Sequence, residues 1–168
     1  MRYLALSVLL AACHHAAAAS GGTPPAPRSS ALGDTLRGTV AVVGSTPRTQ
    51  LVLRPADGGR SVTLAGDSAL LHSVAGLDVM VTGTSGPKSF AVSALLVRSA
   101  GGVAALDGII AATDGAVSIV VAGGQPIALR ATPPEFLART GSRAWVTTAP
   151  DGTVLSFGWI ATPPAGPR

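Results

Sequence analysis

Hydrophobic and polar residues alternate with a period of two along most of the chain after about residue 34. Such alternation is typical of β-strands that bury one face and expose the other. Turn-forming sequences, such as Asp57-Gly58-Gly59 and Thr84-Ser85-Gly86-Pro87, separate the alternating segments. The expected inward positions in the first half are Val40/Val42, Leu51/Leu53, Val62/Leu64, Leu77/Val79/Val81 and Phe90/Val92. The pattern predicts an all-β fold.

The same order of segments occurs twice. Leu36-Arg37-Gly38-Thr39 is matched by Leu106-Asp107-Gly108-Ile109, and Gly76-Leu77-Asp78-Val79 is matched by Gly141-Ser142-Arg143-Ala144. Ala100-Gly101-Gly102 forms the joint between the copies. A repeat of this kind is the signature of duplicated structural units. We therefore predict two similar domains, residues 34–99 (the first repeat) and residues 104–161 (the second repeat), followed by a flexible tail over 162–168.

Each repeat is expected to contain three strands, a short helix and two further strands. Asp67 or Ser68 can cap the first helix, and Thr132-Pro133-Pro134-Glu135 has the form of a capping box before the second. This element order within about 60 residues is that of an OB-type barrel. The copies resemble the OB-like repeats of bacterial envelope proteins of unknown activity. That resemblance implies tandem small OB-like five-stranded barrels, each with one short helix between strands three and four; one larger β-sandwich formed by both copies is the alternative.

The first 13 residues have the form of an export signal. A short positive segment, Met1-Arg2-Tyr3, precedes a mostly apolar stretch from Leu4 to Ala12, which is too short to span a bilayer. Leu10-Ala11-Ala12-Cys13 resembles the lipobox of bacterial lipoproteins, which implies a signal peptide over 1–12 and lipid attachment to Cys13. A thiolate is the nucleophile that such a transfer needs. A simple secretory peptide, cleaved after the alanines, is the alternative and would leave Cys13 as a free thiol.

Residues 13–33 are rich in Pro, Ala, Gly and Ser and show no apolar periodicity, which predicts a lipid-anchored tether. His14 and His15 lack the further ligands that a metal site needs, so no metal is expected. With lipid on Cys13, we expect the chain to be bound to a membrane of the bacterial cell envelope. In a diderm host, the expected location is the periplasmic face of the outer membrane.

Charged residues are sparse, at 12% of the chain, with 12 basic and 8 acidic residues and a net charge of +4. The acidic residues fall mainly at predicted turns and caps, and beyond the tether the only histidine is His72. These residues form no recognisable nucleophile–base arrangement, and the glycines form no phosphate-binding loop. We therefore expect no enzyme activity, no catalytic residues and no cofactor.

OB barrels that bind single-stranded nucleic acid stack bases on aromatic side chains of the middle strands, within a basic groove. The second and third expected strands of both repeats contain no aromatic residue, and the basic residues are spread singly. The late aromatic residues are assigned to core packing: Phe90, Phe136, Trp145, Phe157 and Trp159. No nucleic-acid partner is expected, and a single-stranded nucleic-acid binder is kept only as a second, disfavoured alternative.

Alternation turns Gln50, Val52 and Arg54 outward in the first repeat, with Arg48 and Arg60 in flanking turns. Arginine holds phosphate or carboxylate with two parallel hydrogen bonds. The candidate partner-binding residues are therefore Arg48, Gln50, Arg54 and Arg60. The sequence favours a non-enzymatic, lipid-anchored binding module of the cell envelope that recognises an envelope protein or an anionic glycan or lipid. A purely structural envelope lipoprotein, with a merely solvated strand face, is the main alternative.

Overall fold

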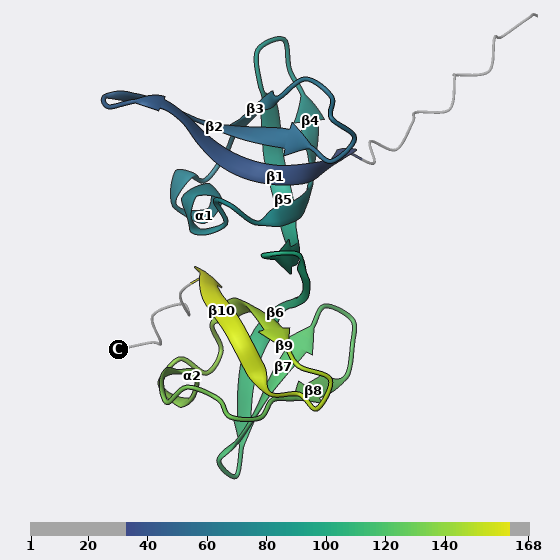
Figure 1. The fold of residues 1–168 in the computed structure, drawn as a ribbon, viewed down its shortest axis with the longest axis vertical. Helices are drawn as coiled ribbons and strands as arrows, with labels where there is room; N and C mark the ends of the chain where they lie inside the picture. Colours follow the sequence, from purple (N-terminus) through teal and green to yellow (C-terminus); the bar gives the residue numbers. More distant parts are fainter. Residues whose placement is uncertain (1–32, 162–168) are drawn as a thin grey trace, which may run out of the picture. The chain divides into compact units, whose positions relative to one another are not determined.

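The computed structural model describes residues 33–161, which form an all-β structure with ten strands and two short helices (Figure 1). The elements of the first repeat are β1 (Asp34–Ser45), β2 (Arg48–Pro55), β3 (Val62–Ala65), α1 (Ser68–Ser73), β4 (Asp78–Ser85) and β5 (Phe90–Ala100). Those of the second are β6 (Val103–Thr113), β7 (Ala116–Val121), β8 (Pro126–Ala128), α2 (Glu135–Ala138), β9 (Arg143–Thr148) and β10 (Val154–Ala161). The expected signal peptide, the tether up to residue 32 with Cys13, and the tail lie outside the described residues.

Strand pairing in the first repeat forms a closed circuit. β1 pairs antiparallel with both β2 and β4, β2 pairs with β3, and β4 pairs with β5. The circuit closes where β3 runs parallel to β5, through Leu64–Phe90 and Ala65–Ala91. The order around the circuit is therefore β1-β2-β3-β5-β4, and every strand has a partner on both sides for part of its length.

The second repeat has the same connections. β6 pairs with β7 and β9, β7 pairs with β8, and β9 pairs with β10. A single parallel bridge, between Arg130 and Thr153, stands where β3 and β5 pair in the first repeat. β5 continues into β6 through Gly101 and Gly102, and the two strands pair as a short antiparallel ladder.

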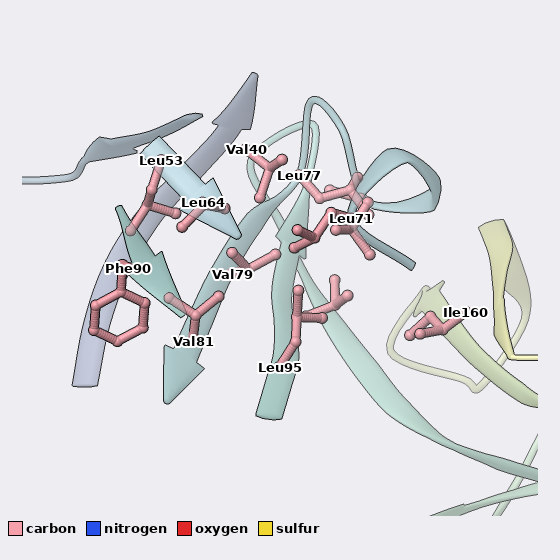
Figure 2. Close-up of a cluster of buried hydrophobic side chains, with 13 residues drawn as sticks. Val40, Leu53, Leu64, Leu71, Leu77, Val79, Val81, Phe90, Leu95 and Ile160 are labelled. Carbon is pink, nitrogen blue, oxygen red and sulfur yellow. The ribbon is translucent and has the colours of Figure 1, made fainter. Parts of the chain in front are cut away.

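Most of the inward residues that alternation predicts lie in the buried core of the first repeat, which also contains Leu71, Val74, Leu95, Val97 and Ala100 (Figure 2). Leu51, Val62 and Val92 are only partly buried against this core. The buried inward residues are Val40, Leu53, Leu64, Leu77, Val79, Val81 and Phe90, and the same cluster includes Ile160 of β10. The prediction fails at Val42, which is 44% exposed. Val42 pairs with Leu51 near the end of the β1–β2 hairpin, whereas β3 pairs with β2 only at Val52 and Leu53. At Val42 the hairpin therefore projects beyond its pairing with β3 and β4, which leaves Val42 exposed.

The aromatic residues pack in or against the two hydrophobic clusters, as the sequence predicts, although Trp145, Phe157 and Trp159 are only partly buried. Phe136 of α2 is fully buried in a second hydrophobic cluster, with its ring edge-on to Phe157 at 4.8 Å between centroids and to Trp159 at 5.4 Å. Phe90 is buried in the first cluster, and Trp145 packs against it. The rings of Phe136, Phe157 and Trp159 have the T-shaped geometry that aromatic pairs prefer.

A glycine at the same position of each repeat allows the first two strands to approach closely. A Cβ atom on Gly38 would overlap the backbone carbonyl of Arg54 on β2. At the matching Gly108, a Cβ would overlap the carbonyl of Val120 on β7. Any larger residue would push the strands apart, which explains why both copies carry glycine in this motif.

The two short helices begin differently. The side chain of Asp67 caps α1 by accepting the backbone N–H of Leu70 at 3.1 Å. The capping box predicted over 132–135 is wrong, because α2 begins at Glu135 behind Pro134 and has no side-chain cap. Its first amides bond instead to the carbonyls of the two prolines. Neither helix of the described segment has the length and apolarity needed to cross a bilayer.

Candidate functional site

Most of the candidate residues lie on the outward face of the β1–β2 ladder. The register pairs Thr39 with Arg54 and Val43 with Gln50, so these side chains share the face opposite to the core. Gln50 and Arg54 are exposed, as alternation predicts. Val52 shares this face and was expected to be exposed, but it is only 6% exposed, between its partners on β1 and β3.

Arg48 lies apart from Arg54. It pairs with Ser45 at the tip of the β1–β2 hairpin, which extends away from the other strands of the first repeat in Figure 1. Six residues along an extended strand correspond to about 20 Å. The structure therefore does not bring Arg48 into a cluster with Arg54, although the two are close in sequence.

Arg37 is the neighbour of Arg54. Thr39 is directly opposite Arg54, and Arg37 is two residues from Thr39 on the same face of β1. Diagonal neighbours of this kind are about 7–8 Å apart in an antiparallel ladder. Both arginines are exposed. The alternation pattern does not identify Arg37 as a partner of Arg54, because it gives the face on which a residue lies but not the register between two strands.

A hollow of about 650 Å³ is lined by Arg37 and also by Arg60, which lies in the loop after β2. It is lined by Thr35, Leu36, Arg37, Pro55, Ala56, Asp57, Gly59 and Arg60. Asp57 is its single acidic residue, and one oxygen of its carboxylate accepts the backbone N–H of Gly59 at 3.1 Å. Arg37, Arg54 and Arg60 are hereafter called the basic face. The three guanidinium groups around this part of the repeat outnumber the two nearby carboxylates, Asp57 in the hollow and Asp78 opposite Thr39 on β4, and so provide a favourable potential for an anion.

Gln50 faces a different hollow, of about 450 Å³, between β2, β3 and α1. Its lining contains no Arg, Lys, Asp or Glu: Thr49, Gln50, Leu51, Thr63, Leu64, Ala65, Gly66, Ser68, Leu71 and His72. The Nδ1 atom of His72 lies 2.8 Å from the carbonyl oxygen of Ser68, within its own helix. Gln50 therefore shares a strand with the basic face but not its charged surroundings.

One ion pair occurs within residues 33–161, between Asp107 of β6 and Arg143 of β9. Both oxygens of Asp107 bond to the guanidinium at 2.8 Å, and the Asp107 side chain is only 2% exposed. One of these oxygens also accepts the backbone N–H of Val97 at 2.7 Å, and Arg143 donates to the carbonyl of Leu95. Asp107 thus lies inside a strand, unlike the turn and cap positions expected for most acidic residues. We call Asp107 and Arg143 the buried pair.

Positive charge is concentrated in the first repeat. Residues 33–100 contain six basic and four acidic residues, whereas residues 101–161 contain three basic and four acidic residues.

Throughout the described segment, no three His, Cys, Asp or Glu side chains lie together as metal ligands. Comparison with known proteins yields no match to a family model, to a curated protein or to a solved structure.

Proposed function

We propose that this chain is a non-enzymatic binding module of the bacterial cell envelope, anchored to a membrane by lipid on Cys13. The export signal and Leu10-Ala11-Ala12-Cys13 support the anchor. Two or more acyl chains would hold such a protein stably, because each buried methylene contributes about 0.8 kcal/mol. Residues 13–33 would then give the folded part its reach from the membrane.

We further propose that the two repeats are tandem OB-like barrels. The pairing circuit β1-β2-β3-β5-β4 supports this assignment for the first repeat, and the matching connections of β6 to β10 support it for the second. Barrels of this type present strand faces and loops to their ligands. The outward strand face of the first repeat is therefore a suitable position for recognition.

The observation that carries the proposed function is the basic face itself. Arg37 and Arg54 are diagonal neighbours on one exposed surface, and Arg60 lines the adjoining hollow with Arg37. Arginine pairs at this spacing suit an anionic group such as a phosphate, a sulfate or a carboxylate. We propose that this surface binds an anionic ligand or an envelope protein that presents one.

A defined polyanion tests this proposal. The full chain, solubilised in a nonionic detergent, would be titrated with dextran sulfate and with uncharged dextran by isothermal calorimetry. We expect binding of dextran sulfate alone, weakened at least tenfold in the variant Arg37→Gln/Arg54→Gln. Arg48→Gln is the matched control, because it removes the same charge from the hairpin tip, and should retain most of the binding. Equal affinities of all three proteins would contradict the proposal, and no binding by the wild type would favour the purely structural alternative.

Two further measurements test the lipid anchor and the nucleic-acid alternative. An intact-mass spectrum of the protein from its native membrane should show a lipid-modified Cys13, and an unmodified cysteine would refute the anchor. Titration with labelled single-stranded DNA at physiological salt should show no micromolar affinity. Salt-dependent micromolar binding would instead favour the nucleic-acid alternative.

A further inference from the structure

The buried pair of the second repeat has a counterpart in the first repeat. In the matched segments, Asp107 corresponds to Arg37, and Arg143 corresponds to Asp78. The two positions are thus charged in both copies, but the acid and the base are exchanged.

The strand registers support this equivalence independently of the sequence match. In the first repeat, Asp78 is opposite Thr39, two residues from Arg37. In the second repeat, Arg143 is opposite Ile109, two residues from Asp107. Each acid and base are therefore diagonal neighbours on equivalent strands.

In the second repeat, these positions hold the edge of an extended strand. Asp107 accepts the backbone N–H of Val97, and Arg143 donates to the backbone carbonyl of Leu95. Trp145, on the same face of β9, packs against the first hydrophobic cluster. A carboxylate and a guanidinium on one sheet face are thus a binding site for a strand edge, with an apolar contact beside it.

The equivalent face of the first repeat holds no strand among the described residues. Arg37 is exposed, Asp78 is partly exposed, and neither is part of an ion pair within residues 33–161. Met80 lies where Trp145 lies in the second repeat and is also partly exposed. Methionine is a flexible apolar side chain that adapts to different partners.

We infer that Arg37 and Asp78 bind the edge of an extended polypeptide segment of a partner protein. Arg37 donates to a backbone carbonyl of the segment, Asp78 accepts a backbone N–H, and Met80 packs against one of its apolar side chains. Main-chain hydrogen bonds are the usual means by which proteins bind extended peptides. This inference rests on the proposed function, because it uses the same outward face and names a protein as the partner.

The exchange of charges determines the direction of the bound segment. In the second repeat, Asp107 on β6 accepts the N–H of Val97, and Arg143 on β9 donates to the carbonyl of Leu95. Because Leu95 precedes Val97, β5 runs in the direction from β9 toward β6. In the first repeat the donor is on β1 and the acceptor on β4. A segment held through the same pair of backbone groups therefore runs in the opposite direction. The first repeat is thus not expected to bind a copy of β5 in the orientation seen within the chain.

The competing explanation is that this face is a polar cap. Terminal units of a repeat array carry polar outer faces because no further unit covers them. On that explanation, the exposed Arg37 and Asp78 only keep the end of the array soluble, and no peptide binds there.

A peptide titration separates the two explanations. The probe is a dye-labelled, end-blocked peptide with the sequence of residues 93–100, Ser-Ala-Leu-Leu-Val-Arg-Ser-Ala, whose backbone the buried pair already holds in the chain. Fluorescence anisotropy would follow its binding to the full chain in nonionic detergent, with the detergent alone as blank. We expect saturable binding by the wild type and about tenfold weaker binding by Asp78→Asn, because the amide oxygen can still accept the peptide N–H but a hydrogen bond to a neutral group is weaker than one to a carboxylate.

Two further variants make the result specific. Asp114→Asn removes the same charge at a turn of the second repeat, and Asn suits the left-handed conformation there, so its affinity should equal that of the wild type. The double variant Arg37→Asp/Asp78→Arg recreates the charge order of the second repeat and should bind within about threefold of the wild type, since a free peptide can reverse its direction. The absence of saturable binding by the wild type, or equal affinities of Asp78→Asn and the wild type, would overturn the inference.

The same proteins titrated with dextran sulfate distinguish this inference from the proposed function. Asp78→Asn should not weaken dextran sulfate binding, because it removes a negative charge near the basic face. Binding of dextran sulfate without binding of the peptide would refute only the strand site. Binding of the peptide without dextran sulfate would refute only the anionic ligand, and the absence of both would refute the two proposals together.

Discussion

Replacing Arg143 with methionine should strongly destabilise the fold. Met has a similar apolar stem but no guanidinium, so Arg143→Met removes both hydrogen bonds to Asp107 and the bond to the carbonyl of Leu95. Asp107 keeps one partner, the backbone N–H of Val97. The substitution therefore leaves a carboxylate in the protein interior without a counter-charge.

The magnitude follows from the burial of the two partners. Removing one member of a buried ion pair costs about 3–5 kcal/mol, because the remaining charge has lost both water and its partner. The Asp107 side chain is 2% exposed, but Arg143 is 29% exposed, so water partly reaches the vacated position. We therefore expect a loss near the lower end, about 3 kcal/mol. The variant Asp107→Asn/Arg143→Met should recover about 1–2 kcal/mol, since a neutral amide can still accept the Val97 N–H without leaving a charge.

Urea denaturation and hydrogen exchange of the Val97 amide would measure these effects. The urea midpoint gives the change in free energy of unfolding, and the exchange rate shows whether the loss is local to the buried pair. Arg130→Met is the control, because this exposed arginine should change stability by no more than about 0.5 kcal/mol. A loss below about 1 kcal/mol for Arg143→Met, with unchanged protection of Val97, would refute this reasoning.

Three further changes have defined consequences. Gly38→Ala should destabilise by about 1–3 kcal/mol in urea, because its Cβ overlaps a carbonyl of the facing strand, and a wild-type midpoint would refute this close approach. Phe136→Ala should cost about 3–5 kcal/mol, whereas the neighbouring Leu137→Ala, at a position 51% exposed, should cost far less; similar losses would contradict the packing described. Hydrogen bonds from the backbone N–H of Thr153 and, to a lesser extent, from its hydroxyl lower the pKa of Asp151. The Asp151 carboxylate therefore stabilises the β9–β10 turn above about pH 3.9, and this stabilisation is lost at lower pH. Amide exchange in this turn should therefore show less acid sensitivity in Asp151→Asn than in the wild type, and equal sensitivity would exclude that contribution.

The sequence was sufficient for features that depend on local chemistry. Alternation predicts the buried positions of the strands because successive side chains point to opposite faces, and Val40, Leu53 and Phe90 are buried accordingly. The helix cap at Asp67 also depends only on neighbouring residues, and it forms as predicted. Val42 departs from the pattern because burial also requires neighbouring elements, and the hairpin projects beyond its pairing with β3 and β4 there.

Properties that depend on the register between distant strands were decided by the tertiary structure. Arg37 and Arg54 are far apart in sequence and become neighbours only through the β1–β2 ladder, whereas Arg48 is closer to Arg54 in sequence and yet lies about 20 Å away. Asp107 and Arg143 likewise meet because β6 pairs with β9. Alternation specifies the face of each strand, since side chains alternate by covalent geometry. It does not specify which residues of two strands lie opposite each other, because turns, glycine contacts and core packing together determine that register.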